Sequence, residues 1–294
     1  MQINSPRQGK IRLTRRGWVV LLTTTAVVVA TAVAVPLLLR GEDDKRPESL
    51  LIPEGWRSNQ VYEAIDKALD VPAGTAKKAA DKAAGKEGKA GLKLPDDADG
   101  NPEGYLFPAT YPIGGQSTPA SLLSFMVNTA NKRWGADAVI QGADRNAVSV
   151  YQIVTIASIV QAEAETKEDM GKVARVVYNR LDHGMPLQMD STINYALNRS
   201  TLDTSRADTK IESPYNTYER LGLPPTPIAN PGDDAVKAAL HPTEGDWLYF
   251  VTVKPGDTRF TADYAEHQRH VDEFNRNRKS EKGTQDAKEA SAAY

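Results

Sequence analysis

The feature that most constrains this chain is an uncharged apolar stretch near its start. Between Arg16 and Arg40, the residues from Gly17 to Leu39 include no Asp, Glu, Lys or Arg. As a helix this stretch would be about 35 Å long, which is enough to cross a hydrocarbon core of about 30 Å. We therefore expect residues 17–39 to form a single transmembrane helix in a lipid bilayer.

The charges on either side of the stretch predict its orientation. Residues 1–16 hold five basic and no acidic residues, whereas an acidic cluster at 42–44 follows the span. Because Lys and Arg stay on the cytoplasmic side, we expect a cytoplasmic basic tail and an extracytoplasmic body. The alternative is a cleaved secretory signal, since Ala-Thr-Ala at 30–32 offers residues that a signal peptidase accepts. Both readings place the chemistry outside the cell membrane.

The composition of the whole chain is that of an ordinary globular protein. Its 294 residues are 40% hydrophobic and 25% charged, with a net charge of −2. Without the basic tail, 31 basic residues stand against 38 acidic ones, a poor match to nucleic acid, which we do not expect as a partner. The chain has no cysteine, which excludes disulfides, thiolate zinc sites and a cysteine nucleophile. We expect neither a metal ion nor another cofactor.

The first segment after the membrane stretch indicates a small βα module. Apolar residues at 50–52 predict a strand, and Pro-Glu-Gly at 53–55 predicts a turn. Ser58 stands where a helix N-cap belongs, before apolar residues at helical spacing. The Ala-, Lys- and Gly-rich segment 75–100 then indicates a surface helix or linker without a core of its own.

The segment 103–112 is dense in aromatic residues and prolines, which predicts a packed, rigid turn. Its aromatic side chains are either core residues or faces on which sugar rings stack. Periodicity and turn signals beyond it predict an α+β body. The expected elements are helices over 122–134, 148–164, 170–181, a short one after 189, 233–240 and 263–278, and a hairpin of 247–253 with 259–261 around a turn at 254–257.

The helix expected over 148–164 is apolar on most of its circumference, which is typical of a central buried helix. Its last turn carries Glu163. Apolar residues lie three, four and seven positions earlier, so the carboxyl group continues the apolar stripe of the helix. Burial disfavours the charged form, and the pKa of Glu163 should rise toward the range in which it can donate a proton at neutral pH.

Several alternatives remain open for this carboxyl group. As a structural residue, Glu163 would pair with Arg175 or Arg180. As the acid of an ordinary glycosidase it would need a second carboxylate, about 5–5.5 Å away in a retaining enzyme or about 6.5–9.5 Å away in an inverting one. Asp190 is the nearby candidate, although it can equally cap a helix that starts at Ser191.

Other catalytic classes find little support in the sequence. No Gly-x-Ser-x-Gly motif is present for a serine hydrolase. His267 and His270 have a spacing of three residues, but on a helix that the sequence indicates to be solvated, with Glu266 and Arg269 beside them, which disfavours a metal site.

A series of ordered motifs resembles those of the endolytic murein transglycosylases, the MltG or YceG-like family of membrane-anchored bacterial enzymes. The resemblance runs from the membrane segment to about residue 275 and opens with Ile-Pro-Glu-Gly at 52–55, the start of a LysM-like module. The motifs that carry it further are Glu-Gly-Tyr-Leu-Phe-Pro at 103–108, Ala-Ser-Ile-Val-Gln-Ala-Glu at 157–163, Tyr-Asn-Arg-Leu at 178–181, Leu-Gln-Met-Asp-Ser-Thr at 187–192, Ser-Pro-Tyr-Asn-Thr-Tyr at 213–218, and Gly-Leu-Pro-Pro at 222–225 with Pro-Ile-Ala-Asn-Pro-Gly at 227–232.

The resemblance implies that Glu163 is the catalytic acid. This chain has Gln161 where relatives carry an earlier Glu, and Ser191 where the family commonly has Pro. A lytic transglycosylase cleaves the β-1,4 bond between N-acetylmuramic acid and N-acetylglucosamine without water and leaves a 1,6-anhydro end. The residues that we place as sugar-contacting or positioning are Gln188, Asp190, Tyr215, Asn216 and Tyr218.

The resemblance also implies partners and a domain order. The partners would be peptidoglycan glycan strands and the lipid bilayer, with peptidoglycan synthases or division proteins as further candidates. A non-catalytic wall-binding or divisome scaffold and a two-carboxylate muramidase are the alternatives. The expected order is a basic tail at 1–16, a transmembrane helix at 17–39, a LysM-like module with an insertion at 48–112, a catalytic domain at 113–279 and a disordered tail at 280–294.

Overall fold

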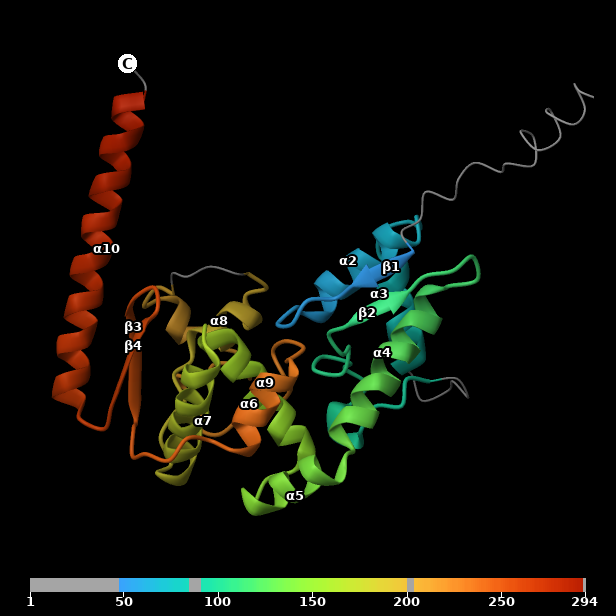
Figure 1. The fold of residues 1–294 in the computed structure, drawn as a ribbon, viewed down its shortest axis with the longest axis horizontal. Helices are drawn as coiled ribbons and strands as arrows, with labels where there is room; N and C mark the ends of the chain where they lie inside the picture. Colours follow the sequence, from blue (N-terminus) through green and yellow to red (C-terminus); the bar gives the residue numbers. More distant parts are fainter. Residues whose placement is uncertain (1–47, 85–90, 200–203, 293–294) are drawn as a thin grey trace, which may run out of the picture. The chain divides into compact units, whose positions relative to one another are not determined.

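The computed structural model describes residues 48–84, 91–199 and 204–292 (Figure 1). The expected basic tail and the expected transmembrane helix over 17–39 lie outside these ranges. Within the described ranges, no helix combines the length and the apolar character that a membrane crossing needs.

The first described elements form a β-α-α-β arrangement. Strand β1 (Ser49–Leu51) and strand β2 (Thr110–Pro112) pair antiparallel with Leu50 opposite Tyr111, and helices α2 (Ser58–Ala68) and α3 (Thr75–Ala84) lie between them in the sequence. The buried side chains of Leu50 and Tyr111 join the main core. The strand and turn expected at 50–55 are therefore present, and a second strand far along the chain completes the sheet.

Two local expectations about this arrangement need correction. Arg57, not Ser58, is the residue before α2, and the Ser58 hydroxyl is buried without a hydrogen-bond partner among the described residues. Helix α3 is more than a surface helix, because Ala76 and Ala80 are buried against the core. The Asp66 carboxylate fixes the start of α3 by accepting the backbone N–H groups of Gly74 and Ala76, each at 2.7 Å.

Five helices form the body of the described chain, and the central one is α6. They are α4 (Pro119–Trp134), α5 (Asp137–Arg145), α6 (Val150–Glu163), α7 (Lys167–Asp182) and α9 (Asp233–Leu240). Ser149 and Gln152 form a capping box at the start of α6, and every residue over 153–160 is buried. Helices α7 and α9 pack against α6 (Figure 1). The prediction of a central buried helix is confirmed, and α5 is an element that the sequence reasoning missed.

The aromatic segment 103–112 lies in the core. Tyr105, Phe107 and Tyr111 are all at least 94% buried, and Phe107 meets Trp134 edge to face at 5.4 Å. Gly104 has a φ of +83°, and a Cβ added there would lie 2.6 Å from the Pro227 side chain. Of the two predictions for these aromatic residues, the one that makes them core residues is confirmed.

The C-terminal elements are a hairpin and a long helix. Strand β3 (Tyr249–Lys254) pairs antiparallel with β4 (Asp257–Thr261), as the turn signal predicts. Helix α10 (Tyr264–Ala292) packs along β3 and extends past Arg278, where the sequence predicts its end (Figure 1). A short helix α8 (Asp190–Ala196) and two 3-10 turns, Asp96–Ala98 and Asp208–Lys210, complete the described elements.

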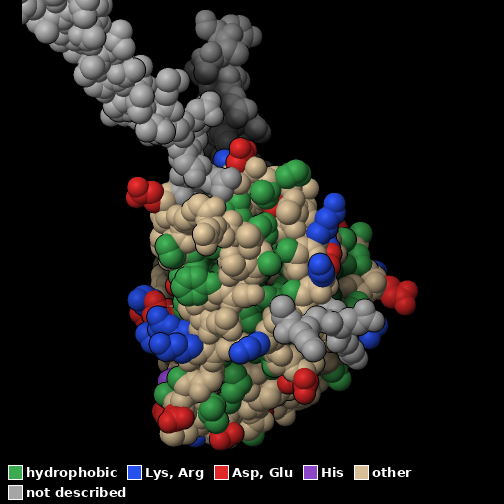
Figure 2. Space-filling model, turned by 90° about the vertical axis from the view of Figure 1, so that its right-hand side faces the viewer, with side chains coloured by type: hydrophobic (Ala, Val, Ile, Leu, Met, Phe, Trp, Pro, Cys, Tyr) green, Lys and Arg blue, Asp and Glu red, His purple; other side chains and the backbone are tan. Residues whose placement is uncertain are grey.

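The fold of the described residues is thus mixed α+β, with helices predominating and two small antiparallel sheets. On the face shown in Figure 2, basic and acidic side chains are interspersed with apolar ones among the described residues. Such a mixed surface agrees with the net charge and offers no extended field of one sign there.

Candidate active site

A cavity of about 910 Å³ lies where the end of α6 meets the segment before α8, strand β3 and one face of α10. It contains four of the six site residues expected from the sequence. The residues that line it are Glu163, Arg180, Leu187, Gln188, Met189, Asp190, Thr204, Tyr218, Tyr249, Phe250, Val251, Thr252, Tyr264, His267, Gln268, Val271, Asp272, Phe274, Asn275 and Arg278.

Glu163 is the last residue of α6, and its side chain is half-buried. The helix ends there because Ala164 is extended, and Thr166 then caps the next helix by accepting the N–H of Asp169. The backbone N–H of Ser191 donates to Glu163 Oε1 at 3.1 Å. The carboxyl group is therefore fixed at a helix end and faces the start of α8.

The surroundings of Glu163 favour its protonated form. Burial raises the pKa of this carboxyl group, and the negative charge of Asp190 adds to the rise. The backbone N–H and the neighbouring hydroxyl of Ser191 act in the opposite direction, but burial is the larger cause. A raised pKa is what a general acid needs near neutral pH.

Arg180 belongs to the wall of the cavity and is 94% buried. Its Nε donates to the Leu248 carbonyl at 2.7 Å, and its Nη1 donates to the carbonyl of Leu187 at 2.7 Å and to Gln188 Oε1 at 3.2 Å. Arg180 thereby ties α7 to the segment before α8 and to the hairpin. Arg175 likewise donates to backbone carbonyls, those of Thr243 and Pro242, and none of the described ion pairs joins either arginine to Glu163.

Asp190 is the first residue of α8, and its side chain does not cap that helix. The hydroxyl of Tyr218 donates to Asp190 Oδ1 at 2.5 Å. The alternative hypothesis, in which the Asp190 side chain caps the helix, is therefore wrong. Asp190 and Tyr218 form a polar pair in the same cavity as Glu163.

Gln188 sits in a left-handed backbone conformation with a φ of +53°, which is uncommon for a residue other than glycine. The backbone N–H of Gln188 donates to the Thr217 carbonyl at 2.9 Å, and that of Met189 donates to Thr217 Oγ1 at 3.0 Å. These bonds hold the strained segment against the loop that carries Tyr218. Such local strain, held by surrounding bonds, is common in ligand-binding segments.

Tyr215 and Asn216 do not line this cavity. The Tyr215 hydroxyl shares a hydrogen bond of 2.9 Å with Thr226 Oγ1. Asn216 is fully buried, and its Nδ2 donates to the carbonyl of Ile211 at 2.8 Å while its Oδ1 accepts the N–H of Tyr218. Both residues hold the loop that brings Tyr218 to the cavity.

Glu103 is a buried acid, 3% exposed, which the sequence reasoning did not single out. The backbone N–H of Ser58 donates to both of its oxygens at 3.0 and 3.2 Å, while Asn230 Nδ2 and the Tyr195 hydroxyl each donate at 3.2 Å. Burial raises the pKa of Glu103 to about 7, against the effect of these bonds and of the Arg57 charge. Glu103 thus joins three segments that are distant in sequence.

An aromatic wall lines the same cavity as Glu163, and it too was missed. Tyr249 of β3 stacks on His267 of α10 with ring centroids 5.1 Å apart, and Tyr264 lies 5.5 Å from Tyr249. The sequence places Tyr264, His267, Val271 and Phe274 three to four positions apart, which is the spacing of one helix face. That periodicity was the available signal.

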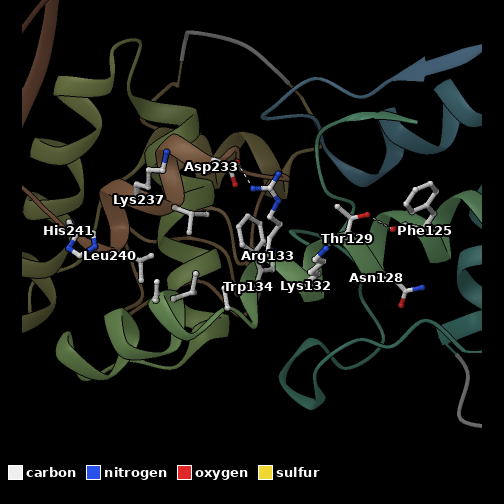
Figure 3. Close-up of a pocket in the computed structure, with 14 residues that line it drawn as sticks. Phe125, Asn128, Thr129, Lys132, Arg133, Trp134, Asp233, Lys237, Leu240 and His241 are labelled. Carbon is white, nitrogen blue, oxygen red and sulfur yellow. Dashed lines mark hydrogen bonds and ion pairs between the residues drawn. The ribbon is translucent and has the colours of Figure 1, made fainter. Parts of the chain in front are cut away.

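A second hollow, of about 860 Å³, lies between α4, α5 and α9 (Figure 3). Its one carboxylate among the described lining residues, Asp233, pairs with Arg133 at 3.3 Å, and Lys132 and Lys237 are also basic. The half-buried acid of this hollow is thus already paired with a cation, whereas none of the described ion pairs involves Glu163. The first cavity is the better candidate for acid–base chemistry.

Fold and cavity together define a mixed α+β protein with one candidate general acid in an open cavity. A model of the YceG-like family matches residues 29–273, and the chain belongs to that family. The crystal structure of a YceG-like protein from Listeria monocytogenes has the same fold, with a TM-score of 0.69 and 31% identity over 76% of this chain and 75% of that one.

Two curated relatives are named endolytic murein transglycosylase. That of Bacillus subtilis is 40% identical over 173 residues, which are 58% of this chain and 48% of the relative. That of Streptococcus pneumoniae is 37% identical over 177 residues, 58% of this chain and 32% of the relative. The match thus spans about half the length of the Bacillus subtilis relative and about a third of the Streptococcus pneumoniae relative.

Proposed function

We propose that this protein is an endolytic peptidoglycan transglycosylase in which Glu163 is the catalytic acid. The observation that supports this most strongly is the half-buried carboxyl group of Glu163 with its raised pKa, placed in an open cavity beside polar and aromatic side chains. The relatives named above supply the substrate class, which is murein.

In the proposed reaction Glu163 acts twice. As an acid it donates its proton to the glycosidic oxygen, and the bond from that oxygen to the anomeric carbon of the muramyl residue breaks. The 6-hydroxyl of the same muramyl residue then attacks its own anomeric carbon and gives its proton to the Glu163 carboxylate. The products are a 1,6-anhydro end and a free 4-hydroxyl, the acid is restored, and no water is consumed.

The residues around Glu163 would bind and orient the sugars. The N–H of Ser191 holds Glu163 Oε1 in place, so that the proton is presented from one direction. Gln188, Asp190 and Tyr218 line the cavity and offer polar groups to sugar hydroxyl and acetamido groups. Tyr215 and Asn216 would act through the loop that carries Tyr218.

Residues 17–39 would anchor the protein in the cell membrane, with residues 1–16 in the cytoplasm and the catalytic domain, 113–279, outside. A tethered active site would meet nascent glycan strands near the membrane and end their elongation, close to peptidoglycan synthases or division proteins. The β1-α2-α3-β2 arrangement supports a LysM-like reading of residues 48–112.

A two-carboxylate muramidase is the second candidate, because Asp190 lies in the same cavity as Glu163. Such an enzyme would hydrolyse the same bond and leave reducing ends. A scaffold without catalysis would leave the strands intact.

Digestion of purified glycan strands followed by mass spectrometry tests these readings. We expect anhydro-muramyl ends from the unmodified protein and from Glu165→Gln, a matched control at an exposed carboxylate two residues away, but none from Glu163→Gln. Reducing ends that disappear in Asp190→Asn would support the muramidase. Intact strands with the unmodified protein would contradict both enzymes.

A further inference from the structure

Helix α10 provides one wall of the cavity that holds Glu163. Tyr264 is the first residue of α10, lines the cavity and is 57% exposed. An exposed tyrosine ring on the wall of a polar cavity presents a flat apolar face with a polar tip. The proposed mechanism leaves this ring without a role.

Tyr264 stands at the open end of a stack of planar groups. The Arg180 guanidinium lies 5.3 Å from the ring centroid of Tyr249, and His267 stacks on Tyr249 at 5.1 Å with an angle of 22°. The Tyr264 ring lies 6.3 Å from His267 and 5.5 Å from Tyr249, and it is tilted against them by 38° and 53°, so it meets the end of the stack at an angle. The inner members of the stack already contact planar neighbours, whereas Tyr264 keeps most of its surface open.

The start of α10 is held firmly, so the ring is pre-positioned. Asp263 Oδ1 caps the helix by accepting the N–H of Glu266 at 2.7 Å. Thr261 Oγ1 accepts the N–H of Asp263 at 3.0 Å and donates to Glu266 Oε2 at 2.6 Å. A ring carried by a fixed helix start loses little conformational freedom when a ligand stacks on it.

His267 supports the stack as a neutral ring. Burial lowers its pKa, and the charges of Arg180 and His270 lower it further. Its Nδ1 is buried without a hydrogen-bond partner among the described residues, which also disfavours a charged imidazolium. His267 therefore presents an uncharged ring beside Tyr264.

We propose that Tyr264, supported by His267 and Tyr249, is a stacking platform for an N-acetylhexosamine ring of the glycan bound in the Glu163 cavity. This proposal rests on the proposed function. The ring of an N-acetylhexosamine is uncharged and carries C–H groups on its faces, which match an apolar aromatic surface. A platform apart from the acid would set how a long strand is held, and would not take part in bond cleavage.

Binding of chitohexaose, a peptide-free β-1,4 oligomer of N-acetylglucosamine, tests the platform. In full-length Glu163→Gln protein, we expect Tyr264→Ala to raise the dissociation constant about fivefold, the effect of losing one aromatic contact. Tyr264→Phe keeps the ring and should stay within about twofold. Phe125→Ala removes another exposed aromatic ring, 49% exposed and outside the cavity, and should have no effect.

The kinetics on purified strands provide an independent measurement. With Glu163 intact, Tyr264→Ala should raise KM about fivefold and change kcat less, and the new ends should still be anhydro ends. A purely structural role in α10 would instead lower the folded fraction and leave KM unchanged.

The outcomes separate this proposal from the proposed function. Equal chitohexaose affinities with and without Tyr264, or no affinity of the Glu163→Gln parent, would overturn the platform. If Tyr264→Ala lost affinity only for strands that carry stem peptides, the platform would also be overturned, because the Tyr264 ring would then contact peptide and not sugar. Absence of anhydro ends from the unmodified protein would overturn the proposed function whatever the affinities.

Discussion

Replacing Glu103 by Gln tests how this fold accommodates a buried acid. The two oxygens of Glu103 accept hydrogen bonds from Ser58, Asn230 and Tyr195. The amide of Gln has nearly the same shape, and its oxygen can keep the bonds to Ser58 and Asn230, while its NH₂ group can donate to the Tyr195 oxygen. The main change is therefore the loss of a titrating charge.

The expected effect follows from the pKa of Glu103, which burial raises from its ordinary 4.5 to about 7. Between these values the folded protein keeps a proton that the unfolded chain has released. The free energy of unfolding must therefore fall as pH rises from 4.5 to 7 and level off above. Each pKa unit corresponds to about 1.4 kcal/mol, so Glu103 should lower the free energy of unfolding by about 3 kcal/mol over this range.

Urea unfolding at several pH values measures this directly. We expect Glu103→Gln to gain about 3 kcal/mol relative to the unmodified protein between pH 4.5 and 7. Glu212→Gln, at an exposed carboxylate, controls for the change in net charge. If the difference between Glu103→Gln and the unmodified protein does not change with pH, burial does not raise this pKa and the reasoning is refuted.

Because burial raises the pKa of Glu163 and the acid must be protonated to act, the rate of strand cleavage should fall as pH rises through that raised pKa. A pH–rate profile in which the rate already falls at the pKa of an ordinary carboxyl group would contradict this. Tyr218→Phe removes the 2.5 Å bond to Asp190 and should lower kcat about tenfold, yet have little effect in an Asp190→Asn background, as a double-mutant cycle would show. Gly104→Ala should lower the free energy of unfolding, measured by urea unfolding, by about 2–4 kcal/mol, because φ is +83° and the new Cβ would lie 2.6 Å from Pro227. A loss below about 1 kcal/mol would mean that the Pro227 side chain moves aside at little cost.

Much of the fold was predictable because its signals are local. The apolar circumference of α6 and the Lys-Pro-Gly-Asp turn between β3 and β4 are present in short windows of sequence. Helix α5 was missed because only Val139, Gly142 and Ala143 of its residues are buried, so its apolar face is narrow.

The site was predictable only in part, because burial of polar groups depends on segments that meet in space. Glu163 could be found since it continues an apolar stripe of its own helix. Glu103 could not, because its partners lie at Ser58, Tyr195 and Asn230, far along the chain. His267 likewise lies on a polar helix, and its packing against Tyr249 of β3 has no counterpart in local sequence.

Cleavage of purified glycan strands in water labelled with heavy oxygen is the most direct test of the central claim. If Glu163 drives attack by the muramyl 6-hydroxyl, every new muramyl end should be a 1,6-anhydro end free of label, and Glu163→Gln should give none. New reducing ends that carry the label would show that water is the nucleophile and would contradict the account.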